Sequence, residues 1–238
     1  MRNLQAFLIR QGAVVSQWHS TSISVLTEPR TILSANENKE FVNKIIDDLQ
    51  AITAGSFGTK LEEQSSDGVR DHVINVDGLS FLHDGDELLG FASSKLFPEQ
   101  GIFYLHGIAI ARHFKGKGSG VALTKSLMDV VRLPLIAFTT QNPIMFRLLR
   151  SLSVATFPSP ALKEIPEHLQ SVGKGLVNGR SGHFDPTTFV VRELYGRCLY
   201  GTIPNCGDPL VDHWFAETLA IKNGLTRNAF LFIGDGKR

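Results

Sequence analysis

The chain has 238 residues, 42% of them hydrophobic and 20% charged, and a formal net charge of +1 at pH 7. This length lies between one large domain and two small ones and suffices to bury a substantial core, while the near-neutral charge speaks against general binding to nucleic acid. No apolar run approaches the ~20 residues that a membrane-spanning helix requires, so we expect a globular protein with neither a nucleic-acid nor a membrane partner.

The amino terminus contains a short apolar stretch that is interrupted by Gln5, Arg10 and Gln11. A signal-peptide core does not tolerate such residues well, so we interpret this segment as mature protein and expect a cytoplasmic location. Cys198 and Cys206 lie in one Gly/Pro-rich stretch, where a loop contact would allow them to pair. A cytoplasmic chain favours two free thiols instead.

The first predicted elements are a strand and a helix. Segment 21–27 alternates and contains β-branched residues, which predicts a strand. A capping box begins at Ser34, and apolar residues then recur every three to four positions. This pattern predicts a helix over residues 35–54 that Gly55 and Gly58 end.

A hairpin and a buried strand follow. The Asp-Gly pair at Gly85 separates two apolar runs, which predicts antiparallel strands over residues 79–83 and 87–97. Segment 101–111 is almost entirely apolar or aromatic, as expected for a central strand covered on both faces. We therefore place segment 101–111 in the middle of the sheet.

Helices and strands alternate in the next part of the chain. Apolar spacing predicts a helix over residues 118–131 and a strand over residues 134–140. Asn142 and Pro143 suit the start of another helix, whose body is residues 144–152.

The carboxy-terminal part gives weaker signals. Residues 153–188 are rich in Pro, Gly and Ser, with one short helix expected within residues 160–172. Strands are predicted over residues 188–196 and 228–236, and between them Asp208 begins a capped helix.

Three glycines, Gly116, Gly118 and Gly120, alternate between the central strand and the following helix. Such a strand, turn and helix amino terminus together form an anion site, because unpaired amides and the positive end of the helix dipole converge there. A Walker A loop needs Gly before its Lys, but Thr124 stands there. A dinucleotide fingerprint needs a different glycine spacing after the first strand of a parallel unit. A flexible surface loop is the alternative interpretation of these glycines, but it does not account for the apolar strand before them or the helix after them.

The segment LHGIAIARHFKGKGSGVALTKSL, residues 105–127, resembles the acyl-CoA signature of the GNAT superfamily of acyl-CoA N-acyltransferases. That motif is Gln/Arg-x-x-Gly-x-Gly/Ala after a central strand. Here Lys115 replaces the usual Gln or Arg and keeps the positive charge, while Ile110, Phe114 and Gly118 stand at the usual spacings. The order of predicted elements over residues 21–152 also matches this family.

The resemblance implies an α+β fold with three layers: a mixed, mostly antiparallel twisted sheet flanked by helices, with an extended C-terminal part. Residues 1–152 would form the GNAT core with the acyl-CoA site. Residues 153–238 would complete the sheet and add a loop and helix that shape the acceptor pocket, within one structural domain.

The resemblance also implies an acyl-CoA dependent N-acyltransferase. An amine would attack acetyl-CoA, or a related short acyl-CoA, directly in a ternary complex. We expect a small-molecule amine acceptor and a monomer or homodimer; a protein acceptor is a third possibility. The alternative is a GNAT-like module that binds acyl-CoA without turnover, as a sensor or interaction partner. The eight histidines show no zinc-type spacing, so we expect no metal.

The resemblance assigns the cofactor to backbone groups and two side chains. Amides of residues 116–120 would hold the pyrophosphate, and the edge of the central strand would pair with the pantetheine arm and offer an amide to the oxyanion. Asn142 would bond the cofactor or cap its helix, and Phe146 would pack on the pantetheine arm or in the core. The expected cofactor-binding residues are Ile108, Ala109, Ile110, Lys115, Gly116, Lys117, Gly118, Ser119, Gly120, Asn142 and Phe146.

His106 is the candidate general base. It lies two residues before Ile108, where the family often has a Glu or His, and LHGIAI resembles the arylalkylamine acetyltransferase branch. An imidazole suits the removal of a proton from an amine. Tyr104, two residues earlier on the same strand face, is the second catalytic candidate, as a relay through water. A core histidine bonded to a carbonyl is the alternative for His106.

The family's proton donor to the leaving thiolate is a Tyr seven residues after the helix-start Asn. Counting from Asn142 gives Leu149, so this chain departs from the pattern. Either Tyr195 or Tyr200 would substitute, or water would protonate the thiolate. The candidates for a contact with the adenosine 3′-phosphate, with simple solvation as the alternative, are Arg112, His113, Lys115 and Lys117. An aromatic or apolar acceptor pocket would use Phe184, Trp214 and Phe215, and a cationic acceptor would be held by Asp185, Asp212 and Glu217. Core packing or a solvated helix face is the alternative for these six.

Overall fold

The computed structural model describes residues 4–162 and 164–237. These residues form two compact units. Unit 1 contains the described residues up to Phe97 together with Phe103–Arg132, and unit 2 contains Pro98–Ile102 and the described residues from Leu133 onward. None of the described helices is both long and apolar enough to cross a membrane.

Unit 1 contains a sheet in which the neighbouring strands follow the chain order. The pairings of the first four strands are antiparallel. The strands are β1 (Val14–Trp18), β2 (Thr21–Thr27), β3 (Gly78–Asp84), β4 (Glu87–Phe97) and β5 (Ile102–Ile110).

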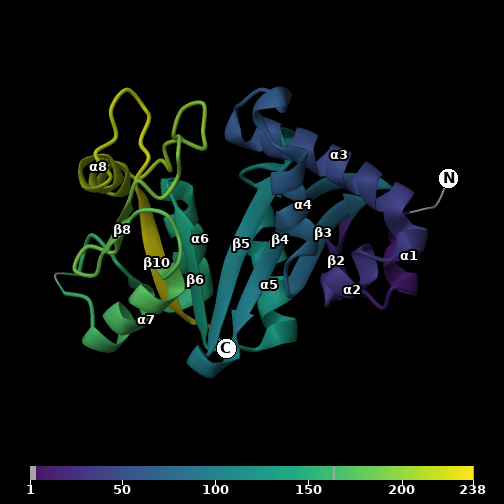
Figure 1. Ribbon diagram of the computed structural model, residues 1–238, viewed down its shortest axis with the longest axis horizontal. Coiled ribbons are helices and arrows are strands. Elements are labelled where there is room, and N and C mark those ends of the chain that lie inside the picture. The colour runs from purple at the N-terminus through teal and green to yellow at the C-terminus, as the bar shows by residue number, and fades with distance from the viewer. Residues whose placement is uncertain (1–3, 163, 238) are drawn as a thin grey trace. The chain divides into compact units, whose positions relative to one another are not determined.

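Helices cover both faces of the unit 1 sheet (Figure 1). One face carries Leu79, Phe91 and Ala109, which share a buried cluster with residues of the first four helices. On the other face, Ser80 Oγ donates to the carbonyl of Leu123, 3.2 Å away on the last helix. The helices are α1 (Leu4–Arg10), α2 (Pro29–Leu33), α3 (Lys39–Phe57), α4 (Ser66–Ile74) and α5 (Ser119–Val131).

Unit 2 is built around one buried strand, β10. It pairs antiparallel with β6, β7 and β9, and β8 pairs with β9. The strands are β6 (Leu135–Thr140), β7 (Ser153–Phe157), β8 (His183–Asp185), β9 (Val190–Arg192) and β10 (Ala229–Gly236), and the helices are α6 (Pro143–Leu152), α7 (Glu167–Val177) and α8 (Pro209–Thr218).

Aromatic rings fill the core of unit 2 on one face of β10. Phe230 and Phe232 alternate along the strand, and Trp214 of α8 stacks on Phe230 with ring centroids 4.5 Å apart. Phe146 of α6 contacts Phe232 at 5.4 Å. Such rings bury large apolar areas, so α6 and α8 are fixed on β10 mainly by aromatic packing.

The structure confirms the predicted fold class, a mixed α/β fold whose mostly antiparallel sheet is flanked by helices. The strand over 21–27, the hairpin, the buried strand, the helix over 118–131 and the strand after it all form as predicted. The division at residue 152 into a core and a completing part stays a prediction.

Some predicted boundaries are wrong. The helix predicted over 35–54 begins as a 3₁₀ turn, and α3 runs from Lys39 to Phe57, because Asn38 rather than Ser34 precedes it. Gly55 lies inside α3, and only Gly58 ends it, with a left-handed φ of 66°. The strand predicted over 188–196 shrinks to β9, because Phe189 and Glu193 on either side have φ of 58° and 54°.

The structure also contains elements that the sequence patterns did not predict or placed differently: α1, α2, α4, α7, β1, β7 and β8. Of these, only a short helix near α7 was predicted, and α7 begins later, at Glu167. Helix α4 has few apolar residues, since Val69, Val73 and Ile74 are its only buried ones. Cys198 and Cys206 are both free thiols.

Gly90 allows the close approach of β4 and β5. A Cβ at Gly90 would stand 2.8 Å from the carbonyl oxygen of Ala109 and 2.9 Å from Ile110 Cδ1. We expect Gly90→Ala to lower the free energy of unfolding by about 1–3 kcal/mol, because the carbonyl group of Ala109 cannot move away without repacking of the two strands. Denaturant unfolding followed by circular dichroism measures this change.

Gly55→Ala is the matched control. Gly55 lies within α3, and a Cβ there would have nothing within 4 Å. This replacement should stabilise the protein by roughly 0.5–1 kcal/mol through helix propensity. Equal effects of the two substitutions would contradict the close approach at Gly90.

Candidate functional site

The glycine segment of unit 1 forms a tight turn between β5 and α5. Gly116 and Gly118 have φ of 79° and 85°, the left-handed conformation that glycine adopts without strain. Gly118 is also the residue that precedes the first turn of α5. An added Cβ at either glycine would meet nothing within 4 Å, so the space beside this main chain is open.

The amide groups of this turn are available to a ligand. Ser119 Oγ donates to the carbonyl of Phe114 at 3.0 Å, and the first helical bond runs from Ala122 N to Gly118 O. Among the hydrogen bonds of the described residues, none uses the N–H of residues 116–121. Unpaired amides at the positive end of a helix dipole attract an anion. The residues present therefore fit a phosphate-bearing ligand such as coenzyme A.

The lysines of the turn have different surroundings. Lys115 Nζ donates to the carbonyl of Ser56 at the end of α3, and burial together with the charge of Arg112 lowers its pKa. Lys117 Nζ lies 4.5 Å from the centroid of the Phe114 ring. Lys115 thus ties the turn to α3 rather than pointing freely into solvent.

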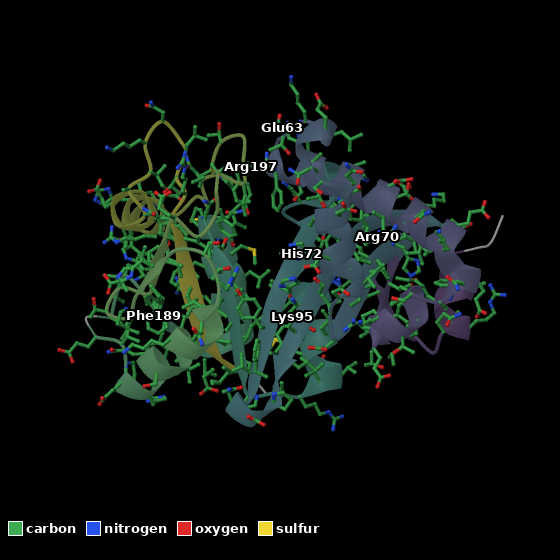
Figure 2. All side chains as sticks on the ribbon, in the orientation of Figure 1. Glu63, Arg70, His72, Lys95, Phe189 and Arg197 are labelled. Carbon is green, nitrogen blue, oxygen red and sulfur yellow. The ribbon has the colours of Figure 1, made fainter. Side chains whose placement is uncertain are left out.

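His106 lies on β5 against α4. Its ring centroid is 4.2 Å from that of His72, with the two planes tilted by 36°. Its Nε2 is 3.7 Å from Asp71 Oδ2, which is longer than a direct hydrogen bond. Within the described residues this buried nitrogen has no hydrogen-bond partner. Figure 2 labels His72, on α4, and Lys95, on β4.

The surroundings of His106 keep its ring neutral. Burial lowers the pKa of His106 to about 3, and the nearby charges of His72 and Lys95 act in the same direction. Asp71 opposes them. The pKa of Asp71 itself is lowered, first by a hydrogen bond from Asn75, so Asp71 stays ionised.

The structure therefore groups three residues with His106 that the sequence did not single out: Asp71, His72 and Lys95. The helix that carries Asp71 and His72 was missed because its apolar pattern is short. In the sequence, Gly107 is a weak indication that another side chain packs closely against β5. A Cβ there would lie 3.0 Å from His72 Nδ1 and 3.2 Å from Ser93 Oγ, so this glycine admits the His72 ring to β5.

The other predicted residues of β5 are mostly buried. Tyr104 is 6% exposed, and its ring meets Phe97 edge-on at 6.2 Å. Ala109 and Ile110 are buried and Ile108 is half-buried, so a ligand would meet their backbone rather than their side chains. Their proposed pairing with a pantetheine arm stays a prediction, as does the role of Tyr104.

Asn142 in unit 2 caps α6. Its Oδ1 accepts from Ile144 N at 2.9 Å, and its Nδ2 donates to Tyr200 Oη at 3.4 Å. The preceding Gln141 is fully buried and bonds both to Leu199 N and to the carbonyl of Thr226. Two consecutive side chains thus hold the segment around Tyr200 at the start of α6.

The two tyrosines that could replace the family's proton donor differ in their partners. Tyr195 Oη lies 3.0 Å from Thr139 Oγ1, whereas Tyr200 contacts Asn142. Burial raises the pKa of Tyr200, although the hydrogen bond from Asn142 opposes this shift. Leu149 is fully buried on α6, beside Gly234 of β10.

Several other predicted residues belong to the core or to turns. Phe146 is 1% exposed between Trp214 and Phe232, so the core alternative describes it and a cofactor contact is not supported. Asp185 accepts from Thr187 within its own turn, and Asp212 accepts from Cys206 N. One oxygen of each carboxylate is thus used within the protein, and a role for either residue towards a cationic acceptor stays a prediction.

Within 4–162 and 164–237, no three or more His, Cys, Asp or Glu side chains are grouped so as to hold a metal ion.

The sequence matches one family model, described as the acetyltransferase (GNAT) family, over residues 44–145. This region includes α4, β5, the glycine turn and Asn142. Residues 44–145 are therefore similar to the GNAT acetyltransferase family. This similarity supports acyl transfer as the general chemistry of the region. No curated protein matches the sequence.

Solved GNAT acetyltransferases resemble the structure distantly. Tetrahymena GCN5 matches with a TM-score of 0.44 at 12% identity, over 65% of this chain and 89% of that one. A putative GNAT acetyltransferase from Desulfovibrio desulfuricans gives 0.41 at 13% identity, over 90% and 98%. The catalytic domain of Tetrahymena GCN5 in complex with coenzyme A gives 0.39 at 12% identity, over 55% and 74%. Likenesses this low say nothing about a substrate.

The neutral His106 predicts a specific pH dependence of stability. The unfolded chain protonates this residue below its ordinary pKa of 6.5, whereas the folded protein does so only near 3. Stability is therefore lost as the pH falls from 6.5 towards 3. Between pH 7.5 and pH 5, the free energy of unfolding of the wild type should fall by about 2 kcal/mol more than that of His106→Gln. Urea unfolding at both pH values measures the difference.

Proposed function

We propose that this protein is an acyl-CoA dependent N-acetyltransferase that transfers an acetyl or short acyl group to a small-molecule amine in the cytoplasm. The observation that carries the proposal is the set of unpaired amides at residues 116–121. They lie between β5 and the first turn of α5, inside the region that matches the GNAT family model. A diphosphate has the charge and the oxygen acceptors that such amides require.

The turn would hold the cofactor mainly through its backbone. Gly116 and Gly118 leave room for phosphate oxygens to approach the amides, because no Cβ intervenes. Arg112 and Lys117 add positive charge beside the turn, whereas Lys115 is used to fix it to Ser56. The bound acetyl-CoA supplies the acetyl group as a thioester.

The reaction forms a bond between the amine nitrogen and the acetyl carbon and breaks the bond between that carbon and sulfur. The amine loses one proton and the departing thiolate gains one, so the protons balance. His106, held neutral by burial, is the proposed acceptor of the amine proton. An amide of β5 near Ile108 is the proposed donor to the oxyanion.

Tyr200 is the proposed proton donor to the thiolate. In this chain Leu149 occupies the family's usual position, and its burial beside Gly234 leaves no space for a phenol there. Tyr200 is the tyrosine that contacts Asn142, the residue that the resemblance assigns to the cofactor. Because its Oη accepts from Asn142 and burial raises its pKa, Tyr200 keeps its own hydrogen to donate.

Coenzyme A binding and turnover test the proposed function. The wild type should bind coenzyme A in calorimetry and release free thiol from acetyl-CoA with at least one member of a panel of amines. Gly116→Ala should weaken coenzyme A binding by about tenfold, because a Cβ enters the space beside the amides and strains a left-handed residue. Binding without thiol release from any acceptor would favour a sensor instead.

Gly12→Ala is the control for this substitution. Gly12 has φ of 78° against 79° for Gly116, and neither has an atom within 4 Å of an added Cβ. Both variants should lose about 1 kcal/mol of stability, but only Gly116→Ala should lose affinity. Equal affinity in both variants would remove the turn from the site.

Tyr200→Phe tests the proton donor. It should lower kcat by roughly 10²-fold and leave the KM for acetyl-CoA almost unchanged, because the phenol proton is needed only as sulfur departs. Steady-state assays of thiol release give both constants. Tyr195→Phe, which removes the contact with Thr139 instead, should retain far more activity. The opposite ranking would assign the role to Tyr195.

A further inference from the structure

Helix α4 places Asp71 and His72 next to each other in sequence but in different surroundings. Val69, Val73 and Ile74 bury one side of the helix, and the side chain of Asp71 remains 52% exposed. His72 is half-buried over β5, where Gly107 leaves space for its ring. One helix thus reaches from a half-buried histidine pair to solvent.

The two imidazoles cannot both carry a charge. Their centroids are 4.2 Å apart, and a second positive charge at that distance is strongly disfavoured in a partly buried site. Lys95 adds a third positive group that faces His106, and Asp71 is the carboxylate that faces it. The cluster therefore keeps His106 neutral, with the carboxylate of Asp71 beside it.

A histidine that stays neutral in such surroundings passes a proton on rather than keeping it. Burial and its cationic neighbours lower the pKa of His106 to about 3, so it cannot retain the proton that an amine gives up. Its buried Nε2 faces Asp71 Oδ2 at 3.7 Å, and a small rotation of the half-exposed carboxylate closes this gap. The buried Ser93 Oγ also has no hydrogen-bond partner among the described residues. Like His72, it lies beside Gly107.

We propose that Asp71 and His72 complete the proton-transfer apparatus: Asp71 carries the amine's proton from His106 to solvent, and His72 positions the His106 ring for this transfer. This inference rests on the proposed acetyl transfer. The proton arrives on one ring nitrogen of His106 while Nε2 releases one towards Asp71, and Asp71 passes it to water. No oxidant or further reactant is needed. His72 is a positioning residue, because it contacts the ring of His106 and not the substrate.

Asp71→Asn tests the proposed transfer of the proton from His106 to Asp71. It retains the shape of the side chain and an oxygen that accepts from Asn75, but it removes the charge. The relay predicts a fall in kcat of roughly 10²-fold with an unchanged KM for acetyl-CoA. Asp67→Asn is the control, since Asp67 is an exposed acid one turn earlier on α4. It should behave as the wild type.

His72→Phe separates positioning from packing. The Phe ring retains the stack on His106 but removes the charge of His72, which is the second cause of the lowered pKa after burial. The pKa of His106 should therefore rise, while burial still keeps it below its ordinary value. Imidazole NMR titration measures this rise, and the acid limb of kcat/KM should move to higher pH with it. A purely structural His72 would leave both unchanged.

The outcomes distinguish the two proposals. An active wild type whose Asp71→Asn variant keeps full kcat would overturn the relay alone, as would an unchanged titration and pH profile in His72→Phe. A wild type that releases no thiol with any amine, although the titration of His106 shifts in His72→Phe, would overturn the proposed function and the relay with it.

Discussion

The main-chain turn at Gly116 and Gly118 is the constraint on which the rest of the site depends. Two left-handed residues in three positions redirect the chain from β5 into α5 and leave a run of amides without protein acceptors. Side chains contribute little to this geometry, apart from Ser119, which bonds back to Phe114, and Lys115, which bonds to Ser56. In the proposed site an anion would be bound by the backbone and the helix dipole, in a chain whose net charge offers no general attraction.

The electrostatics of unit 1 depend on burial more than on charge. His106 remains neutral because its ring is desolvated and lies beside His72 and Lys95. A side chain that stays neutral at physiological pH is ready to accept a proton, yet it gains little free energy by holding one. In the proposed reaction such a base works only where its proton can be passed on, and the exposed carboxylate of Asp71 is the proposed acceptor.

Unit 2 departs from the pattern of the family that the sequence resembles. Leu149 became part of the packing against β10, where it is fully buried. A tyrosine from a distant part of the chain, Tyr200, instead contacts Asn142, and the buried amide of Gln141 fixes the segment that carries it. The hydrogen bonds of Gln141 are costly to break, because each leaves a buried polar group unpaired.

Local signals in the sequence determined the elements with strong patterns: the Asp-Gly hairpin, the apolar strand β5, the glycine turn and the capped starts of α6 and α8. Each depends on residues a few positions apart, where turn chemistry and periodicity act directly. The tertiary structure alone decided that α4 brings Asp71 and His72 to His106, that Phe146 lies in the core, and that Tyr200 rather than Tyr195 contacts Asn142. These outcomes depend on packing between segments remote in sequence, where no short-range pattern records which side chains meet.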